Sequence, residues 1–460
     1  GSVLAGVYYV KDLAGDLTGS IASSVGAGIK FGSATTNDLT WDSMTLATNA
    51  IGIEAGGSGK LTLSDSTFGN NKDFKITGSD LSESPNINRL KKLDITISIG
   101  HDKKNISTAE IVVYSDAIPK DNIELIEAND RDIQCYSRAQ MISQLAKLKS
   151  STVGISGTHG KTTTTSMIGS ILKDSNLDPT IIVGGVVKSI NTNSVLGAGD
   201  TFVVEADEFN RSFLELSPTI AVINNIDLEH VDCYKDLDDL KNAFLQFANS
   251  VPFYGMVSIC KDSDNAASII PFINKPIVTY GIESDDVDFK AINIIHNDGK
   301  VAFDVVHKDK NYTFSMIVPG TYNILNALAA ISVCKTMGLS IENISQSLKM
   351  FSGVKRRFDV KVHNKNLTII DDYAHHPVEV LSVIQAVKSN WNRRLLVVFQ
   401  PHLFSRTKEF YKDFAESLFD ADLIFITEIF ASREKLDLSI SSERISEHLK
   451  ELKHKNVFDI

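Results

Sequence analysis

The residues with the clearest chemical meaning lie between positions 157 and 163. They follow a short apolar run, Thr152 to Ile155, and precede a segment with helical character that continues through Met167. A small loop with inward backbone N–H groups, the positive end of a new helix and a lysine together bind phosphate groups. We therefore predict an ATP or GTP site that comprises Gly157, Thr158, His159, Gly160, Lys161, Thr162 and Thr163.

The loop is shorter than the common phosphate-binding pattern, but Lys161 and Thr162 stand in the expected order, with the Thr162 hydroxyl placed to bind Mg²⁺. The alternative is a glycine-rich turn that contains an incidental lysine. We disfavour it because strand, loop, Lys-Thr pair and helix all agree.

Acidic residues and a histidine follow two further apolar runs. Thr201 to Glu208 reads as a buried strand that ends in three carboxylates, and Ile220 to His230 reads as another that ends in Asp and His. Parallel sheets bind ligands at the carboxyl ends of their strands. Since oxygen ligands suit Mg²⁺, we predict a metal site formed by Thr162, Glu205 and His230; surface or helix-capping roles are the alternative.

Other candidates are weaker on their own. Asn323 and Asn326 share one face of a predicted helix and either read a base edge or cap the helix. Asp80 ends a predicted strand, where it either holds a ribose hydroxyl or caps a helix. Charged residues at the ends of later strands suggest an anionic substrate site rather than merely solvated loops; they are Arg357, Asp371, Asp372, His375, His402 and Arg406.

These residues require a scaffold in which strands alternate with helices. From Phe74 onward the chain shows this alternation, which predicts an α/β fold with parallel sheets. Residues 285–318 read as hairpins with a turn at Asp298-Gly299. We divide the chain into an atypical glycine-rich segment interpreted as β (1–73), a partial first domain (74–149), a central domain (150–349) and a last domain (350–460). Within the first segment, Gly56 to Lys60 is interpreted as a turn.

Composition narrows the class of protein. The 460 residues suffice for several domains, and the net charge of −11 argues against nucleic acid as the main partner. The cysteines at 135, 233, 260 and 334 have no paired spacing, which indicates reduced thiols in a cytoplasmic protein. We expect no signal peptide and no membrane insertion, and composition leaves the oligomeric state open.

Taken together, the motifs from Phe74 to the end resemble the Mur ligases. Those that carry the resemblance begin at Gly157 (GTHGKTTTT), Glu205 (EADE), Leu216 (LSPTIAVI), Asn225 (NIDLEH), Asn323 (NxxN), Gly353 (GVKRRF), Asp371 (DDYAHHP) and Gln400 (QPH). They are most similar to the branch that joins L-alanine to UDP-N-acetylmuramate. A near relative in the family attaches a recycled tripeptide to the same sugar. This activity is the alternative enzyme function for the chain.

The resemblance implies a three-domain ligase of peptidoglycan synthesis. Its first domain, Rossmann-like, would hold the UDP-sugar, its central domain ATP with Mg²⁺, and its last domain, also Rossmann-like, the amino acid. The sugar carboxylate would attack the γ-phosphate to give an acyl phosphate, which the alanine amine then converts to an amide.

The resemblance also implies roles for individual residues. Lys161, Glu205, His230, Arg357 and His375 would be catalytic, with His230 holding a second metal near the sugar carboxylate and Arg357 contacting the transferred phosphate. Asn323 and Asn326 would face adenine, and Asp371 or Asp372 the ribose. Substrate contacts would come from Asp80, Ser115, His402 and Arg406.

Three departures from the family pattern stand out. The family's first strand and its glycine-rich loop are missing from residues 1–73, the family continues past Ile460, and Leu403 stands where an arginine is frequent. The first departure motivates a third hypothesis, a non-catalytic hybrid that binds ATP but not the UDP-sugar.

Overall fold

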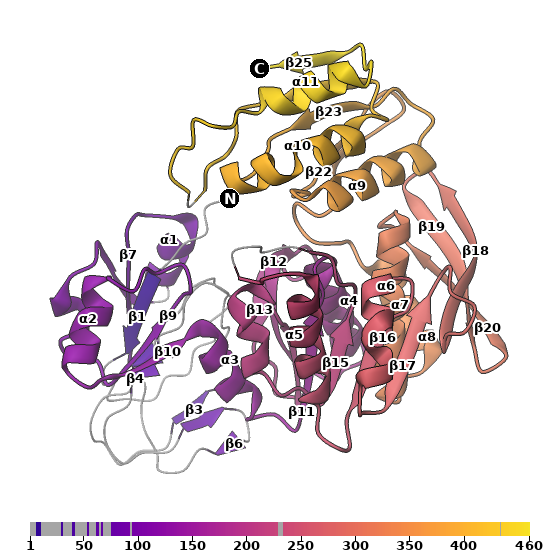
Figure 1. Ribbon diagram of the computed structural model, residues 1–460. Coiled ribbons are helices and arrows are strands. Elements are labelled where there is room, and N and C mark those ends of the chain that lie inside the picture. The colour runs from indigo at the N-terminus through magenta and orange to yellow at the C-terminus, as the bar shows by residue number, and fades with distance from the viewer. Residues whose placement is uncertain are drawn as a thin grey trace. The chain divides into compact units, whose positions relative to one another are not determined.

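The computed structural model describes residues 75–92, 94–228, 233–432 and 434–460, together with short strands before residue 75 (Figure 1). It forms two compact units. One comprises Val3–Lys290 with Asn326–Ser347, and the other comprises Ala291–Leu325 with Leu348–Ile460.

The first domain is a five-stranded sheet in the order β10-β9-β1-β7-β8. β7 (Ile76–Asp80) pairs in parallel with β8 (Thr96–Ile99), and β9 (Ile111–Tyr114) with β10 (Gln134–Ser137). Its helices are α1 (Pro85–Lys91), α2 (Ile123–Asp130) and α3 (Arg138–Ala146), with a 3₁₀ turn η1 (Lys103–Ile106). Each α-helix is preceded by a capping residue, which is Ser84, Asn122 and Ser137 respectively. The side chain of each accepts a hydrogen bond from a backbone N–H at the start of its helix.

The middle of this sheet is occupied by a strand from the glycine-rich segment. β1 (Gly6–Val10) pairs antiparallel with both β7 and β9, so these two neighbours run in the same direction. Asp80 and Ser115 therefore lie at the same edge of the sheet. β1 lies between β9 and β7, and its carboxyl end lies at the edge of the sheet opposite Asp80.

The remaining short strands of the segment pair among themselves. β2 (Ile29–Lys30) pairs with β4 (Ile53–Glu54), and β3 (Leu39–Trp41), β5 (Leu61–Leu63) and β6 (Ser66–Thr67) form a second small sheet. These short strands agree with the β character expected of the segment. The turn predicted at Gly56 to Lys60 lies outside the described residues.

The central domain carries the phosphate loop on a mostly parallel sheet. In spatial order its strands are β13 (Thr192–Val195), β12 (Thr180–Val187), β14 (Thr201–Glu205), β11 (Ser151–Ser156), β15 (Ile220–Ile223), β16 (Met256–Cys260) and β17 (Ile277–Gly281). Only β13 pairs antiparallel within this series. The middle strands are almost wholly buried, as expected for a parallel sheet with both faces covered.

Helices cover this sheet and fix its carboxyl edge. α4 (Lys161–Asp174) packs on β11, β12 and β14, while α5 (Leu237–Asn249) packs on the face that bears Phe202, Val204 and Ala221. α6 (Asp264–Ile269), α8 (Ile341–Met350) and the 3₁₀ turns η2 (Phe209–Glu215) and η3 (Ile270–Phe272) complete it. The ends of β11, β14 and β15 thus meet at one edge, as predicted.

The second unit begins with antiparallel strands. β18 (Phe289–Asn297), β19 (Lys300–His307) and β20 (Lys310–Met316) follow in that order, and both residues of the predicted Asp298-Gly299 turn have positive φ. α7 (Thr321–Thr336) begins immediately after Gly320, where a helix start was expected.

The last domain is the predicted third α/β element. β23 (Leu396–Phe399), β24 (Leu423–Ile426) and β25 (Val457–Asp459) form a parallel sheet. α9 (Pro377–Asn390), α10 (Phe404–Leu418) and α11 (Glu443–Glu451) pack on one face of it through a buried apolar cluster (Figure 1). β21 (Asp359–His363) and β22 (Thr368–Asp371) form a separate hairpin that leads into α9.

Candidate active site

The loop between β11 and α4 has the backbone that phosphate binding requires. Gly157 and Gly160 have φ of +138° and +80°, which glycine adopts at low cost. A Cβ at position 160 would lie 2.3 Å from Asn326 Oδ1, so the space is closed as well. Gly160 caps α4 without a side-chain bond, which leaves the first-turn N–H groups to a ligand.

Lys161 is held inside this loop. Its Nζ donates to Gly157 O at 2.8 Å, to Thr158 O at 3.3 Å and to both carboxylate oxygens of Glu208 at 2.7 Å. The Glu208 side chain is only 1% exposed and that of Lys161 13%. A buried carboxylate thus neutralises the ammonium group beside the phosphate-binding N–H groups.

Thr162 and Glu205 form an oxygen pair next to Lys161. The Thr162 hydroxyl lies 3.0 Å from each Glu205 carboxylate oxygen, and Gly184 N donates to the same carboxylate at 2.6 Å. Mg²⁺ is commonly bound by one or two protein oxygens together with substrate phosphates. The donor set therefore fits the predicted magnesium site.

The turn after β15 supports the loop from below. Thr158 exchanges hydrogen bonds with the backbone of Asp227, at 2.9 and 3.0 Å, and His159 N donates to Asn225 Oδ1 at 2.7 Å. Asn224 Nδ2 donates to Thr164 at 3.1 Å. Thr163 is buried in the first turn of α4. The loop is therefore tied on both sides before any nucleotide binds.

Two of the predicted nucleotide residues, Asn323 and Asn326, are buried and bonded to protein atoms. Asn326 Oδ1 accepts from Thr164 at 3.1 Å, and Asn323 Nδ2 donates to Pro319 O at 2.7 Å. Their proposed contact with adenine stays a prediction. The predicted metal ligand His230 lies outside the described residues. Among those that are described, no three His, Cys, Asp or Glu side chains converge to hold a metal.

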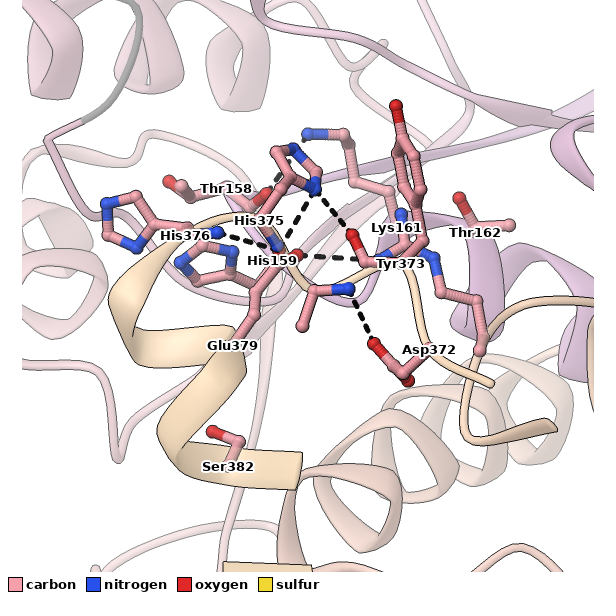
Figure 2. A network of polar contacts seen from close by, with 12 residues as sticks. Thr158, His159, Lys161, Thr162, Asp372, Tyr373, His375, His376, Glu379 and Ser382 are labelled. Atoms are coloured by element: carbon pink, nitrogen blue, oxygen red, sulfur yellow. Dashed lines mark hydrogen bonds and ion pairs between the residues drawn. The ribbon is translucent and has the colours of Figure 1, made fainter. Parts of the chain in front are cut away.

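In the second unit, Glu379 contacts both predicted catalytic residues, Arg357 and His375. Figure 2 shows Glu379 and His375. Glu379 accepts from Arg357 Nη1 at 3.4 Å and from His375 N at 3.0 Å, and lies 3.3 Å from His375 Nδ1. The same Nδ1 lies 2.7 Å from Tyr373 O. Since a carbonyl only accepts, Nδ1 carries the proton and the neutral ring has its lone pair on Nε2.

The neighbouring aspartates differ from one another. Asp372 accepts from Phe358 N at 2.6 Å and Ala374 N at 2.7 Å. Burial raises the pKa of its carboxyl, while the charge of Arg357 opposes the shift. The Asp371 side chain is 40% exposed and lies 3.5 Å from Lys361 Nζ. Asp371 is thus the more accessible of the two residues predicted to meet the ribose.

A cavity of about 190 Å³ opens beside these residues. It is lined by Arg356, Asp372, Tyr373, Ala374, His375, Val398, Phe399, Gln400, His402 and Phe430. His402 is therefore a lining residue as predicted. Arg406 lies outside the lining set, and its Nη1 donates to His402 Nδ1 at 3.4 Å. Arg356, whose guanidinium lies over the Tyr373 ring at 4.8 Å, is the arginine that lines the cavity.

Asp80 and Ser115 mark the carboxyl edge of the first domain. Asp80 is 2% exposed, its Oδ2 has no hydrogen-bond partner within the described ranges, and burial raises its pKa. Ser84 caps α1, which removes the capping alternative for Asp80. Ser115 is buried and accepts from Ala117 N at 3.2 Å. A buried carboxylate oxygen without a partner is suited to receive a ligand hydroxyl.

Several residues of the site escaped the sequence reading. Glu208 was read only as one of three carboxylates after β14, and Arg356 only as part of a basic run. Glu379 had a usable signal, because it is the third residue of α9 and bonds back to its cap, as acidic residues there do. The local sequence gives no signal for Phe430.

Within the described part of the chain, no helix has the length and apolarity needed to cross a bilayer.

Comparisons with known proteins agree with this architecture. The chain matches three family models, described as Mur ligase family, catalytic domain (residues 52–150), Mur ligase middle domain (155–334) and Mur ligase, glutamate ligase domain (356–460). A UDP-N-acetylmuramate–L-alanine ligase of Geotalea uraniireducens is 43% identical over 390 residues, which is 84% of either chain.

Solved structures give the same picture. The UDP-N-acetylmuramate–alanine ligase of Thermotoga maritima aligns with a TM-score of 0.70 and 28% identity over 84% of both chains. A murein peptide ligase of Psychrobacter arcticus has a TM-score of 0.63 at 23% identity, covering 84% of this chain and 85% of its own, and supports the fold alone. Three matched domains and this identity establish that the chain belongs to the Mur ligase family.

Proposed function

We propose that this protein is an ATP-dependent ligase that joins L-alanine to UDP-N-acetylmuramate in peptidoglycan synthesis. The observation that carries the proposal is the 43% identity, over 84% of both chains, to a relative with that activity in its name. Because ATP and UDP-linked sugars are held inside cells, we assign the reaction to the cytoplasm.

The phosphate loop is the proposed ATP site. The N–H groups at the start of α4 and the Lys161 ammonium would bind the β- and γ-phosphates. Thr162 and Glu205 would hold Mg²⁺, which when bound spreads the charge of the phosphates. His230 is proposed for a second metal on the basis of the family resemblance alone.

The reaction then needs two substitutions. The sugar carboxylate attacks the γ-phosphorus, the bond to the bridging oxygen breaks, and ADP leaves. The neutral alanine amine attacks the acyl carbon of the resulting acyl phosphate, phosphate leaves, and the nitrogen gives up one proton to become the amide N–H. Two anions must meet in the first step, so positioning and positive charge carry the rate. Lys161 and Arg357 would supply that charge.

The cavity in the second unit is the proposed alanine site. Arg356 offers a guanidinium for the alanine carboxylate, which answers the lack of an arginine at Leu403. His375 is oriented by Glu379 and Tyr373 O so that its neutral Nε2 can accept an amine proton. His402, held by Arg406, would complete the site. Asp80 and Ser115 are proposed to contact the UDP-sugar.

The test is the release of ADP with every substrate varied in turn. We expect ADP release only when UDP-N-acetylmuramate and L-alanine are both present, and a product of the corresponding mass. If the recycled tripeptide replaces alanine with higher kcat/KM, the protein belongs to the other branch. ATP hydrolysis that is indifferent to both substrates would sink the proposal.

Calorimetry with UDP-N-acetylmuramate alone examines the hybrid hypothesis. The antiparallel direction of β1 makes this measurement necessary, since the carboxyl end of that strand lies at the edge of the sheet opposite Asp80. Saturable binding supports the ligase. Absence of binding, with ATP still bound, supports the non-catalytic hybrid.

A further inference from the structure

The cavity in the last domain is lined by two chemically different groups of residues. Arg356, His375 and His402 can bind charge, while Ala374, Val398, Phe399 and Phe430 are apolar. Most lining residues come from the segments around β22 and β23. Phe430 comes from the segment after β24.

The backbone holds Phe430 in place from both sides. Phe430 N donates to Pro401 O at 2.8 Å, and Phe430 O accepts from Leu403 N at 2.9 Å. The two bonds flank His402, whose ring packs against that of Phe430 with centroids 5.7 Å apart. The two bonds fix the main chain at Phe430, and the contact with the His402 ring gives the Phe430 ring a packing partner.

The partner segment is itself strained. Leu403 has φ of +71°, which residues other than glycine seldom adopt. It is buried and is the N-cap residue of α10. Such conformations persist where surrounding contacts over-determine them, and they gather at ligand sites. The clamp between Leu403 and Phe430 is such a contact.

We propose that Phe430 is the specificity-determining residue of the amino-acid site, because its ring sets the largest side chain that the cavity accepts. This inference rests on the proposed function for the identity of the ligand class, an α-amino acid. Alanine places one methyl group against the apolar lining residues. A branched side chain would have to displace the ring, which its packing against the His402 ring and its bound backbone oppose.

The experiment compares Phe430→Ala with the wild-type protein on glycine, L-alanine, L-serine, L-valine and L-leucine. We expect the ratio of kcat/KM for L-valine to that for L-alanine to rise by at least about 10-fold, the usual effect of a methylene-sized change in a pocket. Phe430→Leu should give a smaller rise, and Phe430→Tyr should keep the wild-type ratio, because its ring remains.

Phe419→Ala is the matched control. Phe419 is 41% exposed against 39% for Phe430, and its ring lies 5.6 Å from that of His454 as Phe430 lies 5.7 Å from His402. We expect Phe419→Ala to leave the ratio unchanged. Thermal unfolding of each variant monitors the fold, and Phe430→Leu decides the matter if Phe430→Ala does not fold.

An unchanged ratio in both smaller variants would overturn the inference, as would an equal change in Phe419→Ala. Failure of this inference can be distinguished from failure of the proposed function. If the wild-type protein prefers a small amino acid other than alanine, the proposed substrate is wrong, yet the shift toward larger side chains still tests Phe430.

Discussion

The phosphate loop and the amino-acid cavity are built on different principles. In the loop, the charge of Lys161 is balanced by Glu208, while the Glu205 carboxylate accepts a hydrogen bond from the neutral Thr162 hydroxyl and keeps its charge. The cavity is an open space walled by rings, with Arg356 stacked on Tyr373. From this difference we expect that removing a charge at the loop abolishes activity. A change of shape at the cavity should instead alter which amino acid is accepted.

The largest effect should come from Lys161→Ala. Loss of a positive group at the developing phosphate charge should lower the rate of ADP release by about 100-fold or more. Lys173→Ala, an exposed lysine in the last turn of the same helix, is the control and should retain the rate. A Lys161 variant with more than half of the wild-type rate would contradict the charge-based reading of the loop.

A smaller effect is expected for Glu208→Gln. The amide can still accept from Lys161 but no longer balances its charge. We therefore expect kcat to fall about 10-fold, a free-energy change equal to that of a one-unit pKa shift. The ammonium also loses the carboxylate that favours its charged form, so the decline of activity with rising pH should begin at lower pH than in the wild type. A full pH–rate profile measures both effects.

Glu215→Gln, an exposed carboxylate at the end of η2, is the control for this variant. If Glu208→Gln and Glu215→Gln give the same profile as the wild type, Glu208 only fills space. A loss of thermal stability without a pH shift would also point to a packing role.

The smallest effect should come from Arg356→Lys at the cavity. Lysine keeps the charge but loses the planar fork that binds a carboxylate with two bonds. We expect KM for L-alanine to rise about 10-fold with a smaller change in kcat. Arg393→Lys is the control, since Arg393 bonds Thr368 and Asn364 O in the same unit. An unchanged KM would mean that the alanine carboxylate binds elsewhere.

The two regions also differed in how far sequence could predict them. Residues 157–163 are contiguous, and a glycine loop before a helix has one usual geometry, so strand, loop and helix were all predicted correctly. Glu208 was missed because its partner lies 47 positions away. The edge shared by β11, β14 and β15 followed from parallel pairing, but which carboxylate meets which atom depends on side-chain packing.

The cavity was harder to predict for the same physical reason. Its walls come from four separate segments, and the placement of Phe430 follows from two backbone bonds to residues 27 to 29 positions earlier, which leave no mark in the local pattern. The direction of β1 was also beyond sequence reasoning, since alternation shows a strand but not the way it runs. The role of His230 stays a prediction.

Gly160 and Asn326 restrict one another in a way that reaches beyond this molecule. Any side chain at 160 would be strained by the positive φ and would also require the Asn326 amide to move or be replaced, because a Cβ there would collide with its Oδ1. A single substitution at Gly160 alone would therefore disturb the phosphate loop. Over evolutionary time the two positions should change together or not at all, and an engineer who wishes to alter one must redesign the other in the same step.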